Sequence, residues 1–146
     1  MKSNKGFTLI ELLAVIVILA IIALIATPTI LGVIETARKG SAESSALGYI
    51  DAVEKQIAID MLEAEASNQI IGSKTSITVG TDDTNLTIKG TKPSAGTVKI
   101  DENKGIITKA ALEITLSGKK YCVQYNGTKA TATAMGTSDT CELANA

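Results

Sequence analysis

The chain has 146 residues, with 14 lysines and arginines, 15 aspartates and glutamates, no histidine and a net charge of −1. This length suits a single domain, and the charge gives no support for nucleic-acid binding through phosphate neutralisation. Without histidine the chain lacks the commonest general base and the commonest zinc ligand. Since the sequence also has no nucleophile elbow and no phosphate-binding loop, we expect neither an enzyme nor a cofactor or metal site.

A long apolar segment begins close to the N-terminus. Residues 12–26 carry no polar side chain, and the apolar character continues to Ile34. As a helix, residues 12–34 would span about 35 Å, which exceeds a hydrocarbon core of about 30 Å. The segment is too long for an ordinary secretory signal, and no small-x-small cleavage site closes it. We therefore expect a retained membrane helix, with Lys2 and Lys5 on the cytoplasmic side.

One carboxylate, that of Glu11, lies at the front of this segment. A charged residue inside an apolar helix costs about 2.5–3.5 kcal/mol, so it needs a partner. Attraction to the positive end of its own helix supplies only about 1 kcal/mol. We therefore favour a functional role for Glu11, and an interaction with its own helix alone is the alternative.

Residues 5–11 (KGFTLIE), followed by the apolar segment, resemble the class III leader and N-terminus of type IV prepilins and the related pseudopilins. The resemblance covers about residues 1–34. It implies that prepilin peptidase cuts between Gly6 and Phe7 on the cytoplasmic face and methylates the new amino terminus at Phe7. It also implies that Glu11 neutralises the terminal amine of a neighbouring subunit during assembly.

Cleavage at this bond would create the missing partner for the carboxylate. The new amine at Phe7 would lie about 6 Å, or one helical turn, from Glu11. A charge pair in a low dielectric offsets much of the desolvation cost of each partner. Phe7 and Glu11 are thus predicted to act together in assembly.

Pro28 lies inside the apolar segment. Proline removes a backbone hydrogen bond and clashes with the preceding turn, which predicts a kink or a locally unwound stretch. Pilins that resemble this chain often have proline here, and the helix around it can melt in the filament. The family often has glycine eight residues earlier, where this chain has Ala20. A static kink in a membrane helix is the alternative.

The helix is expected to continue beyond the membrane, because no strong breaker appears before about Ser67. Apolar residues recur there at three- and four-residue spacing, which predicts an amphipathic helix that covers a sheet and ends near residues 66–72. The expected apolar stripe is Leu47, Ile50, Val53, Ile57 and Met61. The expected solvated face includes Asp51, Glu54, Lys55 and Asp60.

After Gly72 the composition shifts to Thr, Ile, Val, Gly and Lys, which predicts a β-rich head. Ser117-Gly118 and Asn126-Gly127 predict two consecutive hairpins, and Asn-Gly is the stronger signal because both positions of a tight turn need positive φ. We expect an antiparallel meander of three or four strands packed on the helix. Segments that suit strands are 76–79, 86–89, 97–100, 111–116, 121–125 and 130–135.

The two cysteines, Cys122 and Cys141, are not spaced as a CxxC pair. A membrane-inserted N-terminus implies export of the remainder, where a disulfide persists. We expect the two to close a loop of about 20 residues, which stabilises the fold by about 3 kcal/mol. Two buried, unpaired thiols are the alternative. The acidic run at 101–105 is interpreted as a polar turn, because no glutamate completes a calcium loop.

These features predict an α+β, pilin-like fold: a long N-terminal helix with an antiparallel β-meander head on its C-terminal half. We divide the chain into a leader at 1–6, an apolar membrane and filament-core helix at 7–34, an amphipathic extension at 35–71 and the head at 72–146.

The predicted function is that of a type IV pilin, a structural subunit that polymerises into a homo-oligomeric helical filament for adhesion, motility or cell–cell contact. By resemblance, its partners are prepilin peptidase, a pilus assembly platform and, indirectly, a cytoplasmic ATPase. The precursor is expected in the cytoplasmic (inner) membrane and the assembled subunit in an extracellular pilus. The alternatives are a pseudopilin of type II secretion, a competence pilin, or a monomeric single-pass receptor or sensor.

Overall fold

The computed structural model describes residues 6–62, 74–83, 86–101 and 103–144. These residues form the helix α1 (Leu9–Leu62) and the strands β1 (Ser76–Thr78), β2 (Ala95–Asp101), β3 (Ile106–Leu116), β4 (Lys119–Tyr125) and β5 (Ala130–Ala134). The chain divides into two compact units, Met1–Ala37 and Arg38–Ala146. The predicted end of the helix near residues 66–72 lies outside the described residues.

In the first unit, α1 is apolar on all sides. Each of its leucine, isoleucine and valine side chains from Leu9 to Ile34 is exposed. The helix is long and apolar enough to cross a membrane. A helix that is hydrophobic all round is stable only when a bilayer or other helices surround it. This half of α1 therefore needs an apolar environment that the single chain does not supply.

Two threonine hydroxyls of this unit donate hydrogen bonds to the helix backbone. The Thr27 hydroxyl donates to the Ala23 carbonyl at 2.7 Å, and the Thr36 hydroxyl donates to the Gly32 carbonyl at 3.0 Å. Such bonds lower the cost of placing a hydroxyl in apolar surroundings. Pro28 lies within α1, and the residues on both sides of it are helical. Melting of this stretch in a filament stays a prediction.

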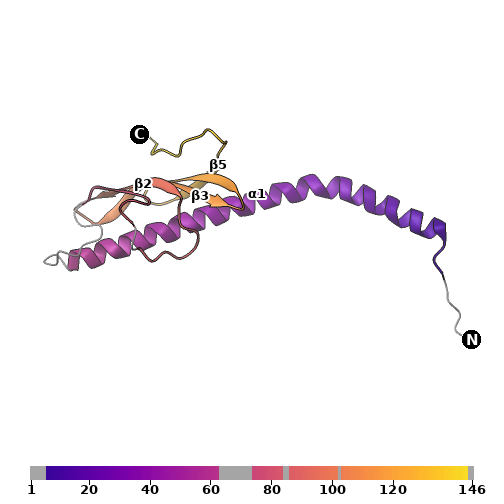
Figure 1. Ribbon diagram of the computed structural model, residues 1–146, viewed down its shortest axis with the longest axis horizontal. Coiled ribbons are helices and arrows are strands. Elements are labelled where there is room, and N and C mark those ends of the chain that lie inside the picture. Colours follow the sequence, from indigo (N-terminus) through magenta and orange to yellow (C-terminus); the bar gives the residue numbers. More distant parts are fainter. Residues whose placement is uncertain (1–5, 63–73, 84–85, 102, 145–146) are drawn as a thin grey trace, which may run out of the picture. The chain divides into compact units, whose positions relative to one another are not determined.

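The second unit is a single five-stranded sheet in the order β1-β2-β3-β4-β5, with every neighbouring pair antiparallel. The sheet lies along one side of the second half of α1 (Figure 1). Side chains alternate as a half-buried sheet requires, so that Ala130 and Ala132 of β5 are buried while Thr131 and Thr133 are exposed. The predicted α+β, pilin-like fold is confirmed, but the sheet has five strands where three or four were expected, because β1 and β2 extend the meander.

The buried face of α1 differs in part from the predicted stripe. Ile50, Val53 and Ile57 are buried as expected, but Leu47 and Met61 are 44% and 52% exposed. The buried positions follow a regular helical spacing that leaves those two residues on the flanks. They are Ala42, Ser45, Ala46, Tyr49, Ile50, Val53, Ile57 and Asp60.

Asp60 was expected on the solvated face, and this prediction is wrong. Its side chain lies on the buried face and accepts a hydrogen bond from the Gln56 amide at 2.8 Å. The apolar pattern missed it because a carboxylate that is hydrogen-bonded can lie on a buried face.

Two carboxylates on the flanks of α1 fix the sheet along the helix. Glu43 Oε1 accepts from the Ala132 backbone N–H in β5 at 2.9 Å, and Glu54 Oε1 accepts from the Ile107 N–H in β3 at 3.2 Å. Glu54 was expected on the solvated face, yet it bonds a strand next to the point where the β2–β3 register shifts. A shifted register leaves backbone groups unpaired, and a side chain can satisfy them.

Both predicted hairpins are present, but their turns differ from expectation. Ser117 and Gly118 have φ of 50° and 78° and form the two-residue turn between β3 and β4. Asn126 begins a four-residue connection instead, in which its Oδ1 accepts from the backbone N–H groups of Thr128 and Lys129. The asparagine amide therefore shapes a longer loop, as Asx side chains commonly do.

The predicted strand at 86–89 is wrong. This segment belongs to the connection between β1 and β2, and its apolar side chains, Leu86 and Ile88, pack against the core from outside the sheet. The connection passes so close to α1 that a Cβ at Gly48 would lie 2.6 Å from the Lys89 carbonyl oxygen. The apolar alternation over these four residues therefore comes from a connection whose side chains pack on the core, and not from a strand.

Asp83 holds the start of the same connection against α1. Its side chain is fully buried, and its two oxygens accept from the Tyr49 hydroxyl at 2.8 Å and from the Gly80 N–H at 2.6 Å. Lys92 Nζ lies 3.4 Å from Asp83 Oδ1. Burial and the hydrogen bond to this carboxylate raise the pKa of Tyr49 far above its usual range, so Tyr49 remains a donor.

Replacing Gly48 by alanine is expected to destabilise the head by about 1–3 kcal/mol, because the new methyl group meets the Lys89 carbonyl. Alanine normally stabilises a helix by about 1 kcal/mol relative to glycine. Gly40→Ala provides the matched control, since a Cβ there has no atom within 4 Å, and it should raise the stability. Urea denaturation of both variants measures the two effects, and stabilisation by both would contradict the close approach at Gly48.

Candidate functional site

The predicted processing and assembly residues lie at the start of α1. Gly6, Phe7 and Thr8 precede the helix and are not helical, and α1 begins at Leu9. The Phe7 side chain is 89% exposed. Together with Glu11, these three residues line a shallow hollow of about 440 Å³.

Thr8 and Glu11 form a capping box that fixes where α1 starts. Glu11 Oε2 accepts from the Thr8 N–H at 2.9 Å and from the Thr8 hydroxyl at 2.7 Å, while the Glu11 N–H points to Thr8 Oγ1 at 3.4 Å. Reciprocal bonds of this kind satisfy backbone donors that the first turn of a helix leaves free.

The capping role of Thr8 was not anticipated from the sequence. The signal that could have found it is the T-x-x-E spacing directly before an apolar run. The carboxylate of Glu11 is therefore already hydrogen-bonded within its own chain. In the described part of the chain these bonds end on Oε2, so Oε1 remains able to accept from a further group.

A family model for the prokaryotic N-terminal methylation motif matches residues 1–27. The N-terminal segment is a type IV prepilin-like class III signal peptide. This signal supports a precursor of the pilin or pseudopilin type and points to a structural protein. It also implies processing by prepilin peptidase. Together with the apolar half of α1, it fits a membrane-anchored precursor. Comparisons with curated proteins and with solved structures gave no match.

Cys122 and Cys141 are joined by a disulfide, with their Cα atoms 5.3 Å apart. The predicted disulfide is therefore present. Cys122 lies between Tyr121 and Val123, whose side chains are buried on the face that packs on α1, so Cys122 points to the opposite, outer face of the sheet. In Figure 1 the tail that follows β5 lies over this outer side.

Glu113 is the main buried charge on the outer face. Its Oε1 accepts from Lys120 Nζ at 2.9 Å and from the Ser94 hydroxyl at 2.8 Å. These two hydrogen bonds, the one from Lys120 first, lower the pKa of Glu113 below its ordinary value of 4.5, although partial burial opposes them. The register places Glu113 directly beside Cys122 on the neighbouring strand.

This lowered pKa predicts a specific pH dependence of stability. Because the folded-state pKa lies below the unfolded one, Glu113 stabilises the head above pH 4.5 and loses this contribution as the pH falls through the folded-state pKa. The Glu113→Gln variant should therefore show a flatter loss of stability on acidification from about pH 5 to 2. Urea midpoints measured across this range test it, and parallel curves for the two proteins would contradict it.

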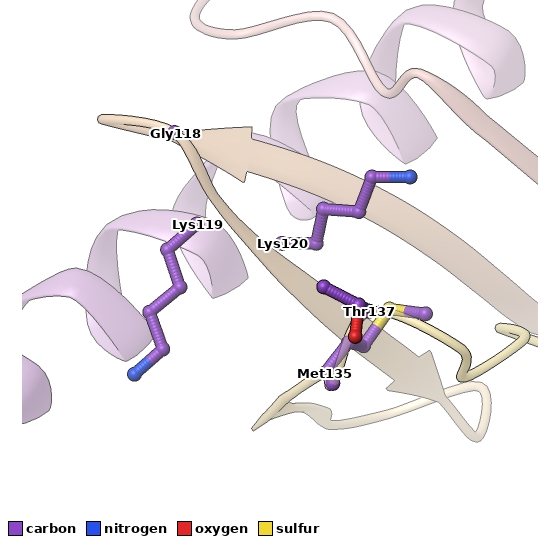
Figure 2. A pocket seen from close by; sticks show the side chains of 6 residues that line it. Gly118, Lys119, Lys120, Met135 and Thr137 are labelled. Carbon is purple, nitrogen blue, oxygen red and sulfur yellow. The ribbon is translucent and has the colours of Figure 1, made fainter.

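A hollow of about 330 Å³ lies beside the turn between β3 and β4. Two lysines line it, but Figure 2 shows Lys119 and Lys120 extending in opposite directions. Lys119 Nζ lies 5.7 Å from the centre of the Tyr121 ring, and Lys120 pairs with Glu113. Since the two charges do not converge, the hollow does not form an anion site.

Residues 103–105 form a turn, as predicted for this acidic run, and residue 102 lies outside the described residues. Asp101 accepts from the Asn103 N–H with its side chain and from the Lys104 and Gly105 N–H groups with its carbonyl. Among the residues that the structure describes, no three Cys, Asp or Glu side chains lie together in a way that could hold a metal ion.

Proposed function

We propose that this protein is a type IV pilin that polymerises through the apolar half of α1 into an extracellular filament. The observation that carries the proposal is the direct connection of a prepilin-like signal to a helix whose apolar side chains are exposed all round. Such a helix can lie in a bilayer before assembly and among copies of itself afterwards. The head would then form the outer surface, for adhesion, motility or contact between cells.

The proposed first step is cleavage between Gly6 and Phe7 and methylation of the new amine at Phe7. The non-helical backbone at residues 6–8 supports this step, because a protease needs an open segment around the bond that it cuts. Prepilin peptidase would act on the cytoplasmic side, and the leader at 1–6 would be removed.

The proposed second step is insertion of the subunit into the growing filament, guided by Glu11. Its bonds from Thr8 both end on Oε2, which supports this role, since Oε1 can then accept from the Phe7 amine of a neighbouring subunit. An ammonium and a carboxylate that meet in apolar surroundings stabilise each other, and either alone would be costly. The pairing would set the axial register between subunits. An assembly platform and a cytoplasmic ATPase would supply the work.

Negative-stain imaging of surface filaments in cells with and without this chain tests the proposal. Loss of the filaments on deletion, with restoration by the wild-type gene, is the expected result. Retention of normal filaments would instead favour a minor pilin, or a pseudopilin of a short secretion or competence filament. A receptor or sensor that acts as a monomer predicts that the purified protein never sediments as filaments.

A further inference from the structure

The C-terminal tail, residues 135–144, is held on the outer face of the sheet by more than the disulfide. At its start the Met135 N–H donates to the Lys120 carbonyl at 2.9 Å, and within the tail itself the Gly136 N–H donates to Asp139 Oδ2 at 2.6 Å. Near its end the Gln124 side-chain amide donates to the Glu142 carbonyl at 2.6 Å. The tail is thus fixed on both sides of Cys141.

Gln124 lies next to one cysteine and bonds the residue after the other. It lies two residues after Cys122 on β4, and residues two apart in a strand share one face of the sheet. Its amide nitrogen also lies 3.4 Å from Cys122 Sγ. Its acceptor, Glu142, directly follows Cys141. One side chain therefore joins the neighbourhood of one cysteine to the neighbourhood of the other.

We propose that Gln124 is a positioning residue for formation of the Cys122–Cys141 disulfide, because it docks the tail before oxidation. The oxidant is a disulfide-bearing thiol, such as oxidised glutathione or a disulfide oxidoreductase. The thiolate of one cysteine attacks the disulfide of the oxidant, which forms a mixed disulfide and releases one thiolate of the oxidant. The thiolate of the protein's second cysteine then attacks the sulfur of its first cysteine in that mixed disulfide and releases the other thiolate of the oxidant. The two cysteines lose two protons and two electrons, and the oxidant is reduced to two thiols.

The second attack is intramolecular, so its equilibrium depends on how often Cys141 lies beside Cys122. The two cysteines are 19 positions apart in the sequence, and an undocked tail loses conformational entropy when Cys141 is brought back to Cys122. Every contact that favours the docked tail raises the effective concentration of one thiol at the other. By linkage, the disulfide and the Gln124–Glu142 bond favour each other equally.

The test measures this effective concentration in the detergent-solubilised full chain. The protein is equilibrated in glutathione redox buffers, and the free thiols are trapped and counted. Because one net hydrogen bond corresponds to about a fivefold change in an equilibrium constant, Gln124→Met should lower the effective concentration about fivefold. Thr131→Ala is the matched control, since Thr131 is the cross-strand partner of Gln124 and is exposed, and it should stay within about twofold of the wild type. An unchanged value for Gln124→Met would overturn the proposal.

A second measurement separates positioning from a general loss of stability. In the Cys122→Ser/Cys141→Ser background, Gln124→Met should speed amide hydrogen exchange in residues 136–142 and leave β3 and β4 unchanged. Equal acceleration in the strands and the tail would show that Gln124 supports the sheet as a whole, which would also overturn the proposal. Neither measurement depends on filament assembly, so the result is independent of the proposed pilin function.

Discussion

Replacing Glu11 by leucine is expected to abolish filament formation while the precursor still enters the membrane and is still processed. Without the carboxylate, the Phe7 amine of a neighbouring subunit has no partner in apolar surroundings. An unpaired charge there costs about 3 kcal/mol, or about a hundredfold in an association constant. Sedimentation of sheared filaments, compared with the amount of processed subunit in the membrane, measures the effect.

The capping box requires two further variants, because Glu11 also fixes the start of its own helix. Glu11→Gln keeps an acceptor for Thr8 but removes the charge, whereas Thr8→Val removes the capping hydroxyl but keeps the carboxylate. If the charge sets the register, Glu11→Gln fails to assemble and Thr8→Val still forms filaments. The opposite pattern would assign Glu11 to helix capping alone, and the register role would be wrong.

Replacing Asp83 by alanine is expected to lower the free energy of unfolding of the head by about 3–5 kcal/mol. The change leaves the fully buried Tyr49 hydroxyl without its acceptor. It also removes the acceptor of the Gly80 N–H and the countercharge of Lys92. These groups fix the connection between β1 and β2 onto α1. The loss therefore combines unsatisfied hydrogen bonds with release of the connection.

Denaturant unfolding followed by tyrosine fluorescence measures this loss, since the chain has three tyrosines and no tryptophan. Asp83→Asn keeps one oxygen as an acceptor, so its loss should be about 1–2 kcal/mol. Tyr49→Phe removes one donor and should cost a similar amount. Losses below about 1 kcal/mol for all three variants would mean that the connection is held by its apolar contacts alone.

The parts of this fold that could be predicted are those set by local patterns. The uninterrupted apolar run identified the first half of α1, and the Ser-Gly and Asn-Gly pairs identified both hairpins around Cys122. The segment at 86–89 was mistaken for a strand because alternation over four residues does not distinguish a strand from a loop packed on a helix. Its neighbour in space, Gly48, lies about 40 residues away, and no local pattern reports such a contact.

The polar groups of the structure were the hardest to foresee. Asp83 is fully buried although no apolar pattern surrounds it, and Glu54, which was assigned to the solvated face, accepts from a strand. A buried or bonding carboxylate depends on donors from distant segments, which only the folded chain brings together. The Thr8–Glu11 capping box was also missed, although it could have been predicted, because both partners lie within one turn and their spacing is a known capping signal.

We expect cleavage at Gly6–Phe7 to convert the precursor into an assembly subunit, and intact mass spectrometry of the native protein measures this conversion. The expected mass is that of residues 7–146 with one added methyl group and one disulfide. Fragmentation should place the methyl group on the amino terminus of Phe7. A native protein that retains residues 1–6 would show that this cleavage does not occur and that the chain is not a processed pilin subunit.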